Sequence, residues 1–163
     1  MRFIKKKTYS SKSKTDLLKH PLNLWIQQDK ILSRFFKHII SELHHADFER
    51  LTKDRDLVFL NCLGHYSATL PTDKNLNIVL IFPNLINEIY KANNSMAYAI
   101  IFHELGHIYH KHFESKNEDI LKQIEADAFA IKYGYGHELL EFLSQYNNEE
   151  SHIRSNEVLK LTN

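Results

Sequence analysis

The sequence predicts an α+β fold that is mostly helical, with a small sheet beside one buried helix. Apolar residues recur at helical spacing over most of the chain, and two short runs, 56–63 and 76–82, are rich in residues that favour strands. Of the 163 residues, 43% are hydrophobic and 25% are charged, which is ordinary for one globular domain. We therefore expect residues 21–163 to form a single domain.

Residues 1–20 are expected to form a flexible basic arm in front of this domain. They hold seven lysine or arginine residues against a single acid, Asp16. A solvated tail that aids solubility is the favoured interpretation, and a contact with nucleic acid or an acidic partner is the alternative. The net charge of +1 gives the whole molecule no electrostatic preference for nucleic acid or membrane.

The remaining composition predicts a cytoplasmic protein with no membrane span. The single cysteine, Cys62, excludes an internal disulfide and is typical of a reducing compartment. No apolar run is long enough to cross a bilayer, and the N-terminal residues have no apolar signal region. The sequence gives no indication of an oligomeric state.

The expected elements follow one another along the chain. An amphipathic helix begins near residue 22 or 27, after Pro21, and ends near 47. The two strands come next, with Gly64, Pro71 and Asp73 in the connection between them, and Pro83 ends the second strand. The later helices are predicted at 85–90, from about 95 through the apolar run 96–102, at 120–132 and at 137–146, before a polar helical or frayed tail. Gly134 and Gly136 are expected to end the helix at 120–132.

The most informative stretch is His103-Glu104-Leu105-Gly106-His107, an HExxH motif that continues a buried helix. Residues four apart lie on one helical face, so His103 and His107 can bind the same metal ion. Glu104 can then take a proton from water held beside that ion. Zinc is the expected ion, because it accepts imidazole nitrogen readily and keeps a position open for water.

A catalytic zinc site needs a third protein ligand, which the sequence offers in the next helix. The HExxHxxGxxH pattern of metzincins is excluded, because Phe113 stands where its third histidine would be and His110 where its glycine would be. Glu125, within Glu125-Ala126-Asp127-Ala128-Phe129-Ala130, is the carboxylate that we expect to bind. The small alanines would let the two helices approach closely.

The HExxH motif, with His112 five residues later and the Glu125–Ala130 stretch, resembles the gluzincin metallopeptidases. The nearest likenesses are the HtpX and CAAX-prenyl protease family and the ImmA/IrrE family. The resemblance covers residues 76–140, about two-fifths of the chain, and leaves the first 60 residues unmatched. It implies a zincin-like domain, a zinc ion and peptide-bond hydrolysis.

The chain departs from these families at one position. Their zinc-binding glutamate usually lies four residues before the aspartate of the Ala-Asp pair, which here is Gln123. Glu125, Gln123 and Asp127 therefore remain candidates for the third ligand. We favour Glu125, because a neutral amide oxygen is a poor zinc ligand beside a carboxylate. Asp127 is also a candidate to accept the second ring N–H of a zinc-bound histidine.

The predicted function is that of a zinc metallopeptidase, with His103, His107 and Glu125 as ligands and Glu104 as general base. A protein or peptide substrate would add to an exposed sheet edge, for which 76–82 is the expected strand. Three alternatives stay open. They are a regulatory protease that cleaves one repressor, as in the ImmA/IrrE family; a peptidase tethered to nucleic acid by the basic arm; and a catalytically weak metal-binding interaction module.

Overall fold

The computed structural model describes residues 13–63, 67–71 and 75–162. In chain order the elements are η1 Lys14–Lys19, η2 Pro21–Asn23, α1 Leu24–Gln27, α2 Lys30–Glu42, α3 His45–Thr52, β1 Asp56–Asn61, β2 Ser67–Pro71, β3 Leu76–Ile81, α4 Pro83–Tyr90, α5 Ser95–Tyr109, α6 Asp119–Lys132, α7 Gly136–Leu143 and α8 Glu149–Thr162. The elements η1 and η2 are 3-10 helices. The predicted α+β class is confirmed. In the described part of the chain, no helix is long and apolar enough to cross a membrane.

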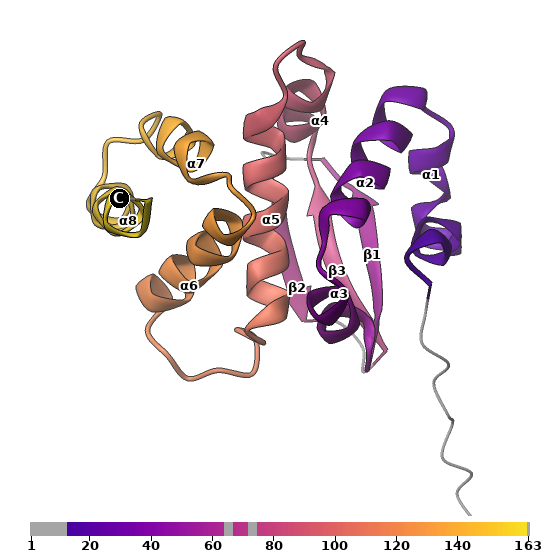
Figure 1. Ribbon diagram of the computed structural model, residues 1–163, viewed down its shortest axis with the longest axis horizontal. Helices are drawn as coiled ribbons and strands as arrows, with labels where there is room; N and C mark the ends of the chain where they lie inside the picture. The colour runs from indigo at the N-terminus through magenta and orange to yellow at the C-terminus, as the bar shows by residue number, and fades with distance from the viewer. Residues whose placement is uncertain (1–12, 64–66, 72–74, 163) are drawn as a thin grey trace, which may run out of the picture.

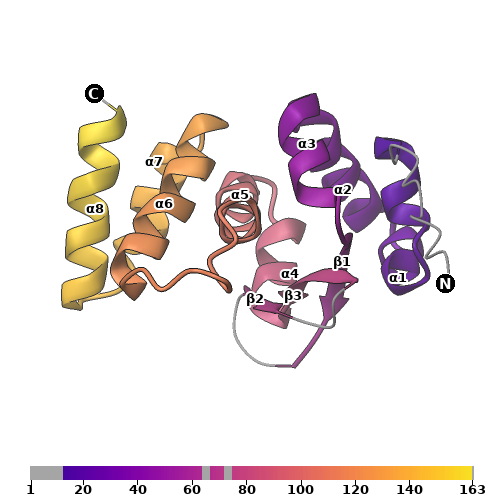
Figure 2. The same ribbon diagram turned by 90° about the horizontal axis from the view of Figure 1, so that it is seen from below.

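Helix α5, which carries the HExxH motif, runs through the middle of the molecule (Figures 1 and 2). The sheet, α2 and α3 lie on one side of it, and α6, α7 and α8 lie on the other. Helix α8 packs against both α6 and α7. The motif helix is therefore enclosed by elements from both halves of the sequence.

The sheet has three strands in the order β1-β3-β2. Strands β1 and β3 are parallel, with Asp56 opposite Leu76, and β2 is antiparallel to β3, with Ser67 opposite Ile81. The predicted strands at 56–63 and 76–82 are confirmed as β1 and β3, whereas β2 falls in the predicted connection. Because β3 is central and paired on both sides, the prediction that it offers a free edge to substrate is wrong.

The outer edge of β1 is covered by the N-terminal segment. The amide of the buried Asn23 donates to the carbonyl groups of Leu17 and Leu57, and its oxygen accepts from the Phe59 N–H at 2.7 Å. The indole of Trp25 donates to the Phe59 carbonyl at 2.9 Å. These side chains supply partners that an edge strand otherwise lacks.

Part of the segment expected to be a flexible arm is folded. Residues 1–12 lie outside the described residues, but Lys14–Lys19 form η1, in which Leu17 and Leu18 are buried. The side chain of Ser13 caps η1 by accepting from the Thr15 N–H. Two apolar anchors and a capped start therefore make this segment part of the fold.

The single helix predicted from near residue 22 or 27 to near 47 is divided into several pieces. It breaks at Asp29, whose carboxylate caps α2 by accepting from the N–H groups of Ile31 and Leu32. It breaks again at Leu43 and His44, before α3. Each break lets the chain turn, so that α1, α2 and α3 cover different parts of the core.

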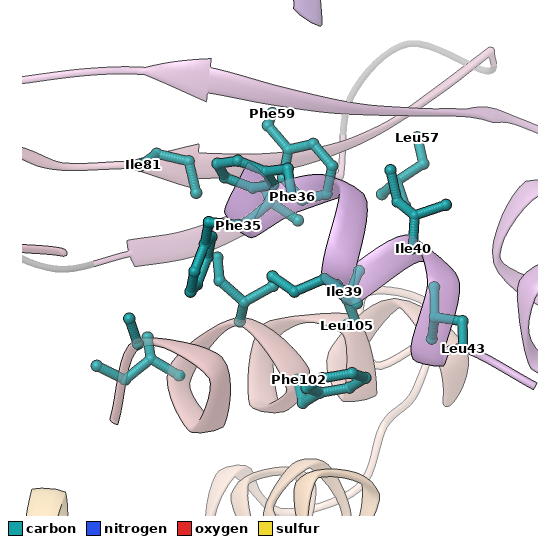
Figure 3. Close-up of a cluster of buried hydrophobic side chains, with 14 of the residues drawn as sticks. Phe35, Phe36, Ile39, Ile40, Leu43, Leu57, Phe59, Ile81, Phe102 and Leu105 are labelled. Atoms are coloured by element: carbon teal, nitrogen blue, oxygen red, sulfur yellow. The ribbon is translucent and has the colours of Figure 1, made fainter. Parts of the chain in front are cut away.

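The core lies between the sheet, α2 and α5. Figure 3 shows the apolar side chains of α2 between the sheet and α5, and Phe36 lies 4.6 Å from Phe59 of β1, centroid to centroid. From α5, Phe102 and Leu105 enter the same cluster and are fully buried. Phe102, just before the HExxH motif, and Leu105, between its two histidines, therefore anchor that helix in the core.

Candidate metal centre

The two motif histidines lie on α5 with their rings nearly perpendicular to each other and their centroids 4.8 Å apart. The Nε2 atoms of His103 and His107 are 3.1 Å apart, and His103 is only 8% exposed. Two nitrogen ligands of one tetrahedral zinc ion are about 3.3 Å apart, from bond lengths of about 2.0–2.1 Å. The pair therefore has nearly the spacing that a shared metal ion requires.

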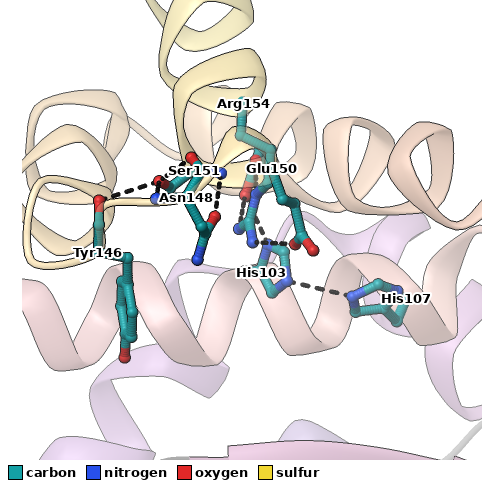
Figure 4. A network of polar contacts seen from close by, with 8 residues as sticks. His103, His107, Tyr146, Asn148, Glu150, Ser151 and Arg154 are labelled. Atoms are coloured by element: carbon teal, nitrogen blue, oxygen red, sulfur yellow. Dashed lines mark hydrogen bonds and ion pairs between the residues drawn. The ribbon is translucent and has the colours of Figure 1, made fainter.

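The ring of His103 is held in place by Asp127 of α6, which is itself held by Arg154 of α8. Its Nδ1 lies 2.7 Å from Oδ1 of Asp127 on α6. Arg154 of α8 donates to both oxygens of Asp127, each at 2.8 Å. Figure 4 shows Arg154 reaching from its helix toward the ring of His103. Burial alone would raise the pKa of Asp127, but His103 and Arg154 lower it below its ordinary value. The ionised carboxylate holds the His103 hydrogen on Nδ1 and leaves Nε2 free to bind.

The ring of His107 is held through a third histidine. Its Nδ1 lies 2.8 Å from Nδ1 of His112, and Nε2 of His112 lies 2.8 Å from Oε2 of Glu125. Burial, together with the nearby His103 and His112, lowers the pKa of His107 to about 3. The ring is therefore neutral near pH 7 and keeps a lone pair for a metal ion.

A left-handed residue at the end of α5 brings His112 back to His107. Lys111 has φ 56°, and the N–H of His112 donates to the His107 carbonyl at 3.1 Å. Such a turn commonly ends a helix, although glycine or asparagine usually occupies it. Here it places the third imidazole beside the second.

Close packing of α5 on α6 brings Asp127 and Glu125 of α6 close to the histidines. A Cβ atom on Gly106 would lie 2.8 Å from the Cα of Ala126 and 2.9 Å from its carbonyl oxygen. Ala126 and Ala130 are fully buried. The expected close approach through small residues is confirmed, with Gly106 of the motif itself as the contact point.

The structure differs from the prediction that Glu125 binds with the two motif histidines. The Glu125 carboxylate contacts His112 and is 42% exposed. Among the described residues, the group whose ligand atoms all lie within 4.8 Å of one another is His110, His112 and Glu125, without His103 or His107. Glu125 and Asp127 are two residues apart on α6, or about 200° around the helix, so only Asp127 reaches His103.

The other residues predicted for the site, Glu104, Asp127 and Gln123, lie on α5 and α6. Glu104 lies on α5 next to His103 and is 8% exposed. Asp127 lies within hydrogen-bond distance of His103, as expected for the partner of a zinc-bound histidine, and Arg154 donates to both of its oxygens. Gln123 is half-buried one turn before Asp127.

Arg154 is the site residue that sequence reasoning missed. It lies in the tail that the sequence predicts to be polar helical or frayed, four residues after Glu150. Its guanidinium is buried against Asp127, 27 residues earlier in the chain. Nothing in the local sequence distinguishes this arginine from a solvated one.

Comparisons of the chain with protein-family models, with curated proteins and with solved structures give no match.

Proposed function

We propose that this protein is a metal-dependent peptidase whose ion is held by His103 and His107. The observation that carries the proposal is the pair of Nε2 atoms 3.1 Å apart on a buried helix. The opposite nitrogen of each ring already has a partner, Asp127 for one and His112 for the other. Zinc fits this donor set, because two neutral imidazoles with fixed tautomers are typical zinc ligands.

The side chains around the ion have separate tasks in the proposed reaction. When bound, zinc supplies a Lewis acid that polarises a carbonyl and lowers the pKa of water. Asp127 and Arg154 fix the ring of His103, and His112 with Glu125 fixes the ring of His107. Glu104 accepts the proton of the attacking water and returns it to the leaving amine.

The third protein ligand determines how tightly this centre binds its ion. Gln123 and Asp127 are four residues apart on α6 and share the face that carries Asp127 to His103. Gln123 is therefore the side chain best placed to complete the set, in the role that Glu125 was expected to fill. A neutral amide binds zinc less tightly than a carboxylate, so we expect modest metal affinity.

The proposed substrate is an extended peptide that lies along β2. Strand β3 is central, and the outer edge of β1 is covered by Asn23 and Trp25. Strand β2 is the other edge of the sheet and packs against α5. A peptide that adds to β2 would therefore run beside the motif helix.

Hydrolysis of an unfolded protein such as casein tests this function. We expect wild-type protein with zinc to hydrolyse it, a chelator to abolish hydrolysis, and Glu104→Gln to bind zinc with hydrolysis reduced at least about a hundredfold. Glu49→Gln is the matched control, because Glu49 is 54% exposed on α3. Hydrolysis by Glu104→Gln at the wild-type rate would refute the role of Glu104.

A second candidate is a metal-binding protein that acts on one specific protein, either as a regulatory protease or as an interaction module. The observation that favours it is that Glu125 contacts His112, and that the cluster of possible metal ligands found among the described residues is His110, His112 and Glu125, without His103 or His107. This candidate would be favoured if wild type and Glu104→Gln both bound zinc and neither hydrolysed casein.

A further inference from the structure

The three histidines of the site form one continuous chain of contacts between two carboxylates. Asp127 contacts His103 at 2.7 Å, His103 contacts His107 at 3.1 Å, His107 contacts His112 at 2.8 Å, and His112 contacts Glu125 at 2.8 Å. Each contact joins two atoms that can both accept a hydrogen bond, so each needs one hydrogen or one cation between them.

The number of available hydrogens is smaller than the number of contacts. Three neutral imidazoles carry one N–H each, whereas the chain has four contacts. One contact is therefore left without a hydrogen, and two lone pairs face each other there. A single metal ion satisfies that contact.

The ion can satisfy the chain at either of two places. With the ion between His103 and His107, His107 carries its hydrogen on Nδ1 and donates to His112, which then donates from Nε2 to Glu125. The other place is the triad of His110, His112 and Glu125, whose ligand atoms lie within 4.8 Å of one another. An ion there takes the Nε2 lone pair of His112 and replaces its contact with Glu125.

We propose that His110, His112 and Glu125 form a second metal site, and that the two sites exclude each other. An ion at the triad leaves the His112 hydrogen on Nδ1, so His112 donates to Nδ1 of His107. His107 must then carry its own hydrogen on Nε2, directed at His103. A nitrogen that carries a hydrogen has no lone pair for a metal, so the first site cannot be occupied.

The triad has the access and the adaptability that a second site needs. The Glu125 side chain is 42% exposed, and the His110 ring lies parallel to that of His112, with centroids 5.4 Å apart. Ligand atoms around one zinc ion lie about 3.3 Å apart, so a modest rotation of His110 and Glu125 closes the triad. The triad thus offers two imidazoles and a carboxylate, a donor set that zinc accepts.

The consequence is that one zinc ion is distributed between two places on the chain. Zinc at the triad removes the tautomer of His107 that the first site requires, so the ratio of the two forms depends on the affinities of the two sites and not on the zinc concentration. The second site is inferred from the positions of His110, His112 and Glu125 alone. The mutual exclusion of the two sites also rests on the proposed function, which places an ion at His103 and His107.

Calorimetric titration with zinc tests this inference on the full chain. We expect one zinc ion per chain for wild type, one for His110→Ala, one for His103→Ala, and none for the double variant. His45→Ala is the control for surface binding, because the His45 side chain is 80% exposed, and it should match wild type. Circular dichroism should verify that each variant is folded.

The outcomes separate this inference from the proposed function. Two zinc ions per wild-type chain would overturn the exclusion, and loss of all zinc from a folded His103→Ala variant would overturn the second site. Loss of all zinc from His110→Ala, with one ion kept by His103→Ala, would refute the proposed first site and leave the triad standing.

Discussion

Arg154 of α8 and Asp127 of α6 form a paired contact in which the guanidinium donates to both carboxylate oxygens at 2.8 Å. The pair is buried, and the same carboxylate contacts Nδ1 of His103. The last helix therefore stabilises the first ligand of the proposed centre.

Removal of the Arg154 side-chain charge should destabilise the fold. We expect Arg154→Met to lower the free energy of unfolding by about 3 kcal/mol, because Asp127 is left buried without its cation. Urea denaturation with a chelator present measures this. The control is Glu150→Gln, because Glu150 is 56% exposed and contacts Arg154 at 3.3 Å, and we expect it to cost less than about 1 kcal/mol. Equal effects of the two variants would contradict this role.

Gly106 should not tolerate even a methyl group. In Gly106→Ala the new Cβ would lie 2.8 Å from the Cα of Ala126, which is backbone and cannot rotate away. We expect a loss of about 1–3 kcal/mol in thermal or urea unfolding. In the control Gly136→Ala, the new atom meets the terminal methyl of Thr162, which can rotate, so a smaller loss is expected. A Gly106→Ala variant as stable as wild type would disprove the close contact of α5 with α6.

Stability should fall at acid pH partly through Asp47. Burial would raise the pKa of Asp47, but hydrogen bonds from Lys132 and Tyr133 lower it below its ordinary value. A lowered folded pKa contributes stability above the unfolded pKa of about 4, and this is lost as pH falls through the folded value. We expect Asp47→Asn to cost about 2 kcal/mol at neutral pH and progressively less as the pH falls.

Denaturation curves over a pH series measure this effect. Asp54→Asn is the control, because Asp54 is 69% exposed and lies 4.0 Å from its nearest cation. A cost for Asp47→Asn that stays constant with pH would contradict the assignment.

A carboxylate at position 123 should strengthen the metal site. Gln123 lies one turn before Asp127 on the same face of α6, so Gln123→Glu places an anion where the proposed centre has an amide. We expect zinc affinity to rise at least about tenfold in a competition assay with a chelating dye. Lys122→Gln is the control, because it makes the same change of one charge unit on the neighbouring face. An equal rise in both variants would indicate a general electrostatic effect.

The sequence predicts those elements whose signals are local. The HExxH helix begins after Asn94, which forms its N-cap, and α6 follows the predicted range closely. Pro83 begins α4 and Gly134 follows α6 in a left-handed conformation with φ 89°, as their backbone preferences indicate.

The features that the sequence does not predict depend either on a local signal that the helical pattern masks or on contacts between distant residues. Asp29 interrupts an otherwise continuous helical pattern, because its carboxylate caps the next helix. The approach of Arg154 to Asp127 depends on how α8 packs on α6. The contact of Glu125 with His112 depends on the left-handed turn at Lys111, a residue that gives no signal for that conformation.

Nitrogen-15 NMR of the histidine side chains during zinc addition tests the central claim most directly, because it shows which ring nitrogen carries hydrogen and which binds metal. With one equivalent of zinc or less, we predict that the Nε2 signals of His103 and His107 shift to metal-bound values while their Nδ1 atoms keep hydrogen. If the signals of His103 and His107 did not change, or if only those of His110 and His112 shifted, the proposed centre would be contradicted.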